Sequence, residues 1–204
     1  MSSGVIGTKG VPRAEREGQI VAEAVEEFAD RGYAGASVAD IAARAGISKP
    51  LIYQYFGSKD GLYLACLNQV AGGLLDRMQL AELSVDDTVA SRVFPLQAIF
   101  EALEPQRAAW KLLYDTTIPS AGEVSDAADG YRTRMQLMAA SGSERFLSAR
   151  GYHNDLDTNL LMNVWTGLVN NLVTWWLDHP AESAEAMTQR CIRLMGAIWQ
   201  DPST

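Results

Sequence analysis

A short stretch of the sequence, between Asp40 and Asp60, combines cations with aromatic hydroxyls in a chain that is acidic overall. Its only charged side chains are Arg44, Lys49 and Lys59, whereas the whole chain of 204 residues has a net charge of −8. Ammonium and phenol groups are donors that proteins use toward phosphate oxygens and base edges. The stretch is therefore a candidate anion-binding surface, while the acidity of the rest argues against a protein that coats nucleic acid through its overall charge.

Two short helices that meet at a glycine would position these side chains. Ser37 is a favourable N-cap with Asp40 three residues later, and the first helix then ends at Gly46. Ser48 can cap the second helix, whose Pro50 falls in the first turn, where the missing N–H costs nothing. This arrangement is that of a helix-turn-helix, in which the first helix braces the second in the DNA major groove. A helical hairpin that only packs is the alternative interpretation of the same geometry.

The residue types in this region also resemble a known family. The stretch Ser37–Tyr63, SVADIAARAGISKPLIYQYFGSKDGLY, closely resembles the DNA-binding signature of the TetR family of transcriptional repressors. Phe28, Gly32 and Tyr33 extend the match, so that it covers about the first 65 residues. The resemblance implies a homodimer that binds a double-stranded DNA operator. The remaining two-thirds of the chain resemble the family only in length and in all-α character.

Helical periodicity and capping residues recur to the end of the chain, and no run of alternating residues predicts a strand. Besides the two short helices, helices are expected over residues 12–31, 58–78, 87–103, 105–116, 125–149, 155–178 and 183–199. We therefore expect an all-α fold in two domains. A three-helix helix-turn-helix domain would cover residues 1–64, with 1–11 as a flexible arm, and a helical effector-binding and dimerisation domain would cover residues 65–204.

Eight residues of the helix-turn-helix and its flanks are candidate DNA contacts. They are Ser37, Ser48, Lys49, Pro50, Leu51, Tyr53, Tyr55 and Lys59. Lys49 can donate to guanine O6 and N7, and Leu51 can contact a thymine methyl group. Tyrosine hydroxyls can reach phosphates, and Lys59 lies at the start of the next helix, which favours an anion. Two alternatives stay open, namely that Lys49 contacts phosphate alone and that Tyr55 is half-buried packing.

Three further basic residues flank the start of the first helix, namely Lys9, Arg13 and Arg16. They could form an arm along the DNA backbone or in the minor groove. A solvated tail without DNA contacts is the alternative.

The second domain is expected to hold an effector pocket, because it carries more tryptophan and tyrosine than core filling needs. The candidate ligand-binding residues are Trp110, Tyr114, Asn163, Trp165 and Asn170. The two asparagines belong to a polar stripe on the helix over 158–177, which carries no charged residue. Buried amides need partners, which a ligand, water or a second subunit can supply. We expect a mostly apolar pocket for a small hydrophobic or aromatic effector.

Apolar residues on the last two helices exceed what one neighbouring helix can cover. The candidate dimer-interface residues are Leu168, Leu172, Trp176, Met187, Cys191, Leu194 and Ile198. A twofold axis would convert this pair of helices into a four-helix bundle, which is also the interface that the family resemblance implies.

No motif of a known catalytic or metal site occurs in the sequence. His153 and His179 have no neighbouring ligand partners, and Cys66 and Cys191 are too far apart for a metal or redox spacing. We therefore expect no catalytic residue, no metal and no cofactor. The first 11 residues lack the apolar core of a secretory signal, and the asparagines of 158–177 argue against a membrane span, so a cytoplasmic protein is expected.

Together these features predict a ligand-responsive transcriptional repressor that binds a palindromic operator as a dimer. By the resemblance, effector binding would move the helix over 58–78 and change the distance between the two DNA-reading helices. The alternative is a helical small-molecule carrier, or an enzyme on a helical scaffold, in which the hairpin only packs.

Overall fold

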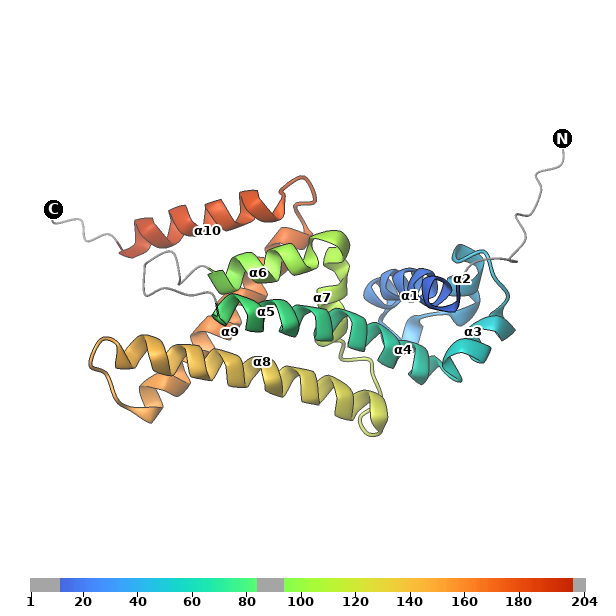
Figure 1. The fold of residues 1–204 in the computed structure, drawn as a ribbon, viewed down its shortest axis with the longest axis horizontal. Helices are drawn as coiled ribbons and strands as arrows, with labels where there is room; N and C mark the ends of the chain where they lie inside the picture. The colour runs from blue at the N-terminus through green and yellow to red at the C-terminus, as the bar shows by residue number, and fades with distance from the viewer. Residues whose placement is uncertain (1–11, 84–93, 200–204) are drawn as a thin grey trace.

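The computed structural model describes residues 12–83 and 94–199, and within these ranges the chain forms helices and turns but no strand. Figure 1 shows a small cluster of N-terminal helices at one end and a larger helical body at the other. The N-terminal cluster consists of α1 (Arg13–Gly35), α2 (Val38–Arg44), α3 (Lys49–Phe56) and α4 (Lys59–Leu67), which leads into the body. The expected all-α fold is confirmed, and the predicted arm over 1–11 lies outside the described residues.

One apolar stripe of helix α1 packs in the core of the N-terminal cluster. Val21, Ala24, Val25 and Phe28, the residues expected on this stripe, are all buried. Gly32 interrupts the helix at φ +67°, as predicted, because glycine enters the left-handed region at little cost. One more helical turn follows it, so α1 extends four residues beyond the expected end at residue 31.

The two short helices meet as the sequence predicts, although only one of the expected caps forms. The Ser37 hydroxyl accepts a hydrogen bond from the Asp40 N–H at 3.2 Å and caps α2. Ser48 precedes α3 but makes no capping hydrogen bond through its side chain, so that prediction is wrong. Gly46 supplies the turn between the helices at φ +66°, and Ile52 anchors α3 in the core with no exposed surface.

The helix expected over 58–78 is longer than predicted and is interrupted in the middle. Helix α4 passes through a π-helical turn, Asn68–Gly72, into α5 (Gly73–Leu83). A π-helical turn accommodates an extra residue without ending the helix. The Tyr131 hydroxyl donates a hydrogen bond to the Asn68 side chain at 2.7 Å, which ties this turn to the body.

The body is built from antiparallel and crossing helices. Its remaining elements are α6 (Phe94–Leu103), a 3-10 helix (Glu104–Ala109), α7 (Trp110–Leu113), α8 (Glu123–Ser148), α9 (Asp155–Leu177) and α10 (Ala184–Trp199). Helix α6 packs between α5 and α10, and α8 packs against α4 and α9. The helix expected over 105–116 is broken, because Gln106 leaves helical geometry at φ −154°. Part of the helix expected over 87–103 lies outside the described residues.

No helix within residues 12–83 and 94–199 is both long and apolar enough to span a bilayer.

A buried carboxylate links α1 to the start of α2. Glu27 is only 2% exposed, and its carboxylate accepts hydrogen bonds from the Ser37 N–H and from Arg44, both at 3.0 Å. Arg31 lies 3.4 Å away on the other side. A buried charge costs free energy unless it is paired and hydrogen-bonded, and here both conditions are met. Glu27 therefore sets how the bracing helix leaves α1.

Replacing Glu27 with Ala should destabilise the protein by about 2–4 kcal/mol, because Arg44 and the Ser37 N–H lose a shielded acceptor together. Chemical denaturation followed by circular dichroism measures the change. Asp30→Ala is the matched control, since Asp30 is exposed on the same helix and should change stability by less than about 0.5 kcal/mol. Equal effects of the two substitutions would contradict the assigned role of Glu27.

Candidate nucleic-acid interface

Helix α3 presents one continuous exposed face to solvent. Lys49, Pro50, Tyr53 and Gln54 are exposed on it, and their spacing places them on the side opposite the buried Ile52. The Lys49 ammonium lies 5.8 Å from the centroid of the Tyr53 ring, which is 38% exposed. This face can enter a DNA groove without disturbing the packing of the helix.

Gln54 is a residue of this face that the sequence analysis missed. It lies four positions after Pro50, a spacing that places both residues on the same side of the helix. A glutamine amide can donate to adenine N7 and accept from the adenine N6 amino group. Leu51, by contrast, is half-buried, so less of its side chain is available to a thymine methyl group.

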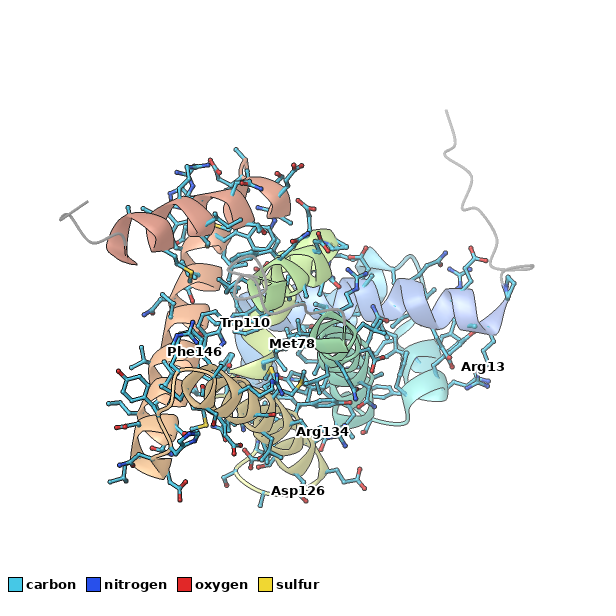
Figure 2. All side chains as sticks on the ribbon, turned by 60° about the vertical axis from the view of Figure 1, so that its left-hand side comes forward. Arg13, Met78, Trp110, Asp126, Arg134 and Phe146 are labelled. Carbon is cyan, nitrogen blue, oxygen red and sulfur yellow. The ribbon has the colours of Figure 1, made fainter. Side chains whose placement is uncertain are left out.

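Tyr55 lies at the edge of this face and is half-buried. The guanidinium of Arg13 is 5.1 Å from the centroid of its ring, and this contact joins the start of α1 to α3. Figure 2 shows Arg13 at the outer end of α1, where it belongs to a helix rather than to an arm. The packing alternative for Tyr55 is thus supported, and Arg13 remains available beside α3.

Lys59 points back toward the end of α1. Its ammonium donates to the Ala36 carbonyl at 2.8 Å and lies 4.9 Å from the centroid of the Tyr33 ring. An ammonium has three donors, so these contacts leave capacity for a phosphate at the start of α4. The predicted phosphate contact of Lys59 stays a prediction, as do the predicted DNA contacts of Ser37 and Ser48.

A hydrogen bond between Tyr33 and Asp60 joins the end of α1 to the start of α4, next to Lys59. The Tyr33 hydroxyl donates to the Asp60 carboxylate. Burial, followed by the Asp60 hydrogen bond and charge, raises the pKa of Tyr33 to about 12. The phenol is therefore a neutral donor at any physiological pH.

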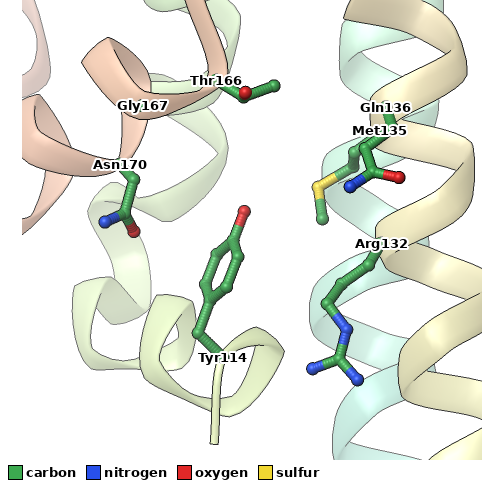
Figure 3. Close-up of a pocket in the computed structure, with 7 residues that line it drawn as sticks. All are labelled: Tyr114, Arg132, Met135, Gln136, Thr166, Gly167 and Asn170. Atoms are coloured by element: carbon green, nitrogen blue, oxygen red, sulfur yellow. The ribbon is translucent and has the colours of Figure 1, made fainter. Parts of the chain in front are cut away.

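A pocket of about 330 Å³ lies in the body between the end of α7, α8 and α9 (Figure 3). Its lining residues are Tyr114, Arg132, Met135, Gln136, Thr166, Gly167 and Asn170. The pocket therefore includes the predicted Tyr114 and Asn170. Five of the seven residues carry hydrogen-bonding side chains, so the pocket offers more polar groups than we expected, while its apolar character stays a prediction.

Three of the predicted ligand contacts do not line this pocket. Trp110 is buried among the helices of the body (Figure 2), and its indole N–H donates to the Asn170 side chain at 3.1 Å. Trp165 packs half-buried against the core. Asn163 is exposed and donates to the Asn159 carbonyl of its own helix at 2.8 Å. None of these three side chains lines the pocket, so the structure gives no support to their predicted ligand contacts.

Helix α8 supplies three of the five pocket residues that the sequence analysis missed, and its polar sequence had given no signal for them; Thr166 and Gly167 of α9 are the other two. The Arg132 guanidinium donates to the Leu113 carbonyl at 3.1 Å and to Asp129 at 2.6 Å. Partial burial raises the pKa of Tyr114 on the opposite wall, although nearby Arg132 counteracts part of this shift. The pocket thus offers a cation and several neutral donors and acceptors next to one methionine.

Three predicted interface residues are buried inside the chain itself. Trp176 packs its ring 5.2 Å from that of Phe100 and donates to the Glu182 carbonyl at 2.8 Å. Met187 and Cys191 are buried in the same core. Because α6 covers both Trp176 of α9 and this side of α10, these side chains are not available to a partner, and the interface predictions for them are wrong.

Other apolar side chains of the last two helices are exposed. Leu194, which was predicted at the interface, is 54% exposed, while Leu168 and Leu172 are half-buried. The exposed apolar residues that the sequence analysis missed are Leu156, Leu160, Val164, Trp175 and Ile192. The side chain of Ile198 lies outside the described part of the structure.

A family model described as bacterial regulatory proteins of the tetR family matches residues 20–66, which include α2, α3 and most of α4. This segment is a TetR-family DNA-binding domain. FasR of Mycolicibacterium smegmatis, an HTH-type transcriptional activator, is 37% identical over 105 residues, which make up 52% of this chain and 48% of FasR. The chain therefore spans about half the length of that relative.

Two solved structures share the fold of the chain over most of its length. A TetR-like transcriptional regulator from Rhodococcus sp. RHA1 has a TM-score of 0.71 at 24% identity and covers 94% of this chain and 100% of its own. AibR, in complex with isovaleryl coenzyme A and operator DNA, has a TM-score of 0.71 at 17% identity over 88% of this chain and 97% of AibR. The TetR-family domain and the helical body thus have the fold of these regulators.

Two lysines of the TetR-family domain should affect DNA binding in different ways. Lys49→Ala should change the preference among operator variants, since Lys49 is exposed on α3. Lys59→Ala should weaken binding about equally on all sequences and reduce the salt slope by roughly one unit. Gel shifts across a salt series measure both effects, with the exposed Lys111→Ala of α7 as the control. Parent-like binding by both variants would contradict the assignment of α3 to the groove.

Proposed function

We propose that this protein is a ligand-responsive transcriptional repressor that binds a palindromic DNA operator as a homodimer. The observation that carries the proposal is the exposed face of α3, with Lys49, Tyr53 and Gln54 aligned on a helix that α2 braces within a TetR-family domain. A helix held in this way can insert its first turns into the major groove. The exposed Ser48 hydroxyl at the start of α3 would donate to a phosphate.

The DNA sequence would be read by few side chains. Lys49 would donate to guanine, and Gln54 would pair with adenine through its amide. Pro50 and the half-buried Leu51 offer only apolar contact. Discrimination between operator sequences would therefore depend in part on DNA shape, which contacts from the domain to the DNA backbone can sense.

Dimerisation is supported by the apolar side chains that α9 and α10 leave exposed. Leu160, Val164 and Trp175 lie on α9, and Ile192 and Leu194 lie on α10. Exposed apolar residues that gather on one pair of helices are typical of an interface. A twofold axis along these helices would place the two α3 helices about 34–36 Å apart, which is one turn of DNA.

The effector would bind in the pocket between α7, α8 and α9. Met135 and the Tyr114 ring can contact an apolar or aromatic group, while Gln136, Asn170 and Arg132 can donate to carbonyl or other acceptor oxygens. AibR binds isovaleryl coenzyme A, whose short branched acyl group has this combination of features. We infer an effector with a small hydrophobic body and at least one acceptor group.

The operator is tested by selection from random double-stranded DNA, followed by gel shifts at several salt concentrations. The selected sequence should be palindromic, and the affinity should fall steeply with salt. A transcription assay with that operator upstream of a reporter then determines whether the protein represses, which matters because FasR is named as an activator. The carrier or enzyme alternative predicts no sequence preference at any salt concentration.

Ligand binding is tested by thermal shift with isovaleryl coenzyme A and a panel of small aromatic and branched-chain acids. A ligand at 100 times its Kd should stabilise the protein by about 2.7 kcal/mol and raise the melting temperature accordingly. Gln136→Leu should reduce that rise, since it removes a polar group from the pocket, whereas Gln79→Leu on the exposed side of α5 should not. A panel without any shift would contradict the sensor role.

Dimerisation is tested by replacing Leu194 with Asp. A charge at the exposed apolar surface of α10 should give monomer or aggregate and should abolish operator binding, although Leu194 is far in sequence from the DNA-binding domain. Sedimentation at micromolar concentration measures the change. Leu137→Asp, at a similarly exposed leucine of α8, is the control and should remain dimeric.

A further inference from the structure

The end of α1 depends on hydrogen-bond acceptors from the body. Gly32 interrupts the helix, and the turn that follows begins a new helical segment, whose first N–H groups have no acceptor within it. The Tyr33 N–H donates to the Asp115 carboxylate at 2.6 Å, and the Ala34 N–H donates to the Thr117 hydroxyl at 3.1 Å. Both acceptors lie in the loop after α7, more than 80 residues further along the chain.

The approach of this loop to α1 is close. A Cβ atom at Gly32 would lie 2.5 Å from the Thr117 hydroxyl oxygen, so only glycine fits. Asp115 holds Thr117 in place, since its other carboxylate oxygen accepts the Thr117 N–H at 2.8 Å and the Thr117 hydroxyl at 2.7 Å. The loop is therefore fixed by its own hydrogen bonds as well as by those from α1.

The same loop also contacts α4. The hydroxyl of Tyr63, which is fully buried, lies 3.1 Å from the Leu112 carbonyl and 3.3 Å from the Asp115 carboxylate. The ring of Tyr63 packs edge-on against those of Phe28 and Tyr33, with centroids 4.8 and 5.3 Å apart. Burial, followed by the Asp115 charge, raises the pKa of Tyr63, so its proton stays available for these bonds.

The opposite side of this segment faces the pocket. Tyr114 lies between Leu113 and Asp115 in the chain, and its side chain forms one wall of the pocket, with Arg132 on the other (Figure 3). The Arg132 guanidinium donates to the Leu113 carbonyl at 3.1 Å. The segment thus contacts the DNA-binding domain through Leu112, Asp115 and Thr117, and the pocket side through Leu113 and Tyr114.

We propose that residues 112–117, which we call the latch, transmit the presence of an effector to the DNA-binding domain. This inference rests on the proposed function of the pocket. An effector that contacts Tyr114 and Arg132 competes with the Arg132 bond to Leu113 and shifts the latch backbone. The shift weakens the bonds from Tyr33 and Ala34 to Asp115 and Thr117, which releases the end of α1 from the body. Asp115 and Thr117 are positioning residues and touch neither DNA nor effector.

The first test measures amide hydrogen exchange at Tyr33 and Ala34 in the full-length protein. Thr117→Val keeps the shape of the side chain but removes the acceptor, and it should speed exchange at Ala34 by at least about tenfold. Asp115→Asn should do the same at Tyr33. Thr116→Val is the matched control, because Thr116 is exposed next to Thr117, and it should leave both amides unchanged. Unchanged exchange in the first two variants would overturn the latch.

The second test asks whether the pocket side of the latch reaches the same two amides. Arg132→Gln shortens the side chain that holds the Leu113 carbonyl, and it should speed exchange at Tyr33 and Ala34, which Arg132 does not touch. Arg134→Gln, at an exposed arginine of the same helix, should leave them unchanged. A purely structural role of Asp115 and Thr117 predicts no effect of Arg132→Gln on these amides, and that result would overturn the proposal.

The third test links the latch to DNA through a double-mutant cycle on a selected operator. The effects of Arg132→Gln and Thr117→Val on affinity should depart from additivity by at least about threefold, because both act on one segment. The cycle of Arg132→Gln with Thr116→Val should be additive within about twofold. Additive effects in both cycles would overturn the latch and leave operator binding intact. If no operator is found, the proposed function fails, and the exchange measurements still decide whether the latch exists.

Discussion

Hydrogen-bond donors that a helix cannot satisfy by itself determine how the two parts of this molecule are joined. Gly32 breaks α1, and the turn after it presents N–H groups to Asp115 and Thr117 of the body. The Tyr33 amide is partly buried, and an unpaired amide shielded from water costs about 1–3 kcal/mol, so its acceptor Asp115 stabilises this junction. That hydrogen bond and the buried Tyr63 hold the N-terminal domain against the body.

Within the DNA-binding domain, a second buried polar group has a comparable effect. Glu27 accepts from the start of α2 and from Arg44, so the angle between α1 and the bracing helix is set by a shielded carboxylate. The apolar stripe of α1 and Ile52 then fill the space around it. The buried Ile52 holds α3 in place from its inner face, and under the proposed function a helix held in this way would lose little entropy on binding DNA.

Helix α9 has three sides with different surroundings. One side must pack Val173 and Trp176 into the core, and another lines the pocket through Thr166 and Asn170. A third side exposes leucine, valine and tryptophan, which are available to a second subunit. A helix with three such sides carries no charged residue over most of its length, because a charge would be buried or unpaired on two of them.

Local patterns in the sequence determined the helices, the glycine turn and the DNA-binding domain, because helix caps, apolar spacing and the signature from Ser37 to Tyr63 all act within a few residues. The rotation of each helix in the body was decided only by the tertiary structure. Trp176 and Met187 match an interface stripe in spacing, yet α6 covers them, and Arg132 reaches the pocket from a helix whose sequence is polar. The bonds of Asp115 and Thr117 to Tyr33 and Ala34 join residues about 80 positions apart, and periodicity within one helix carries no information on such contacts.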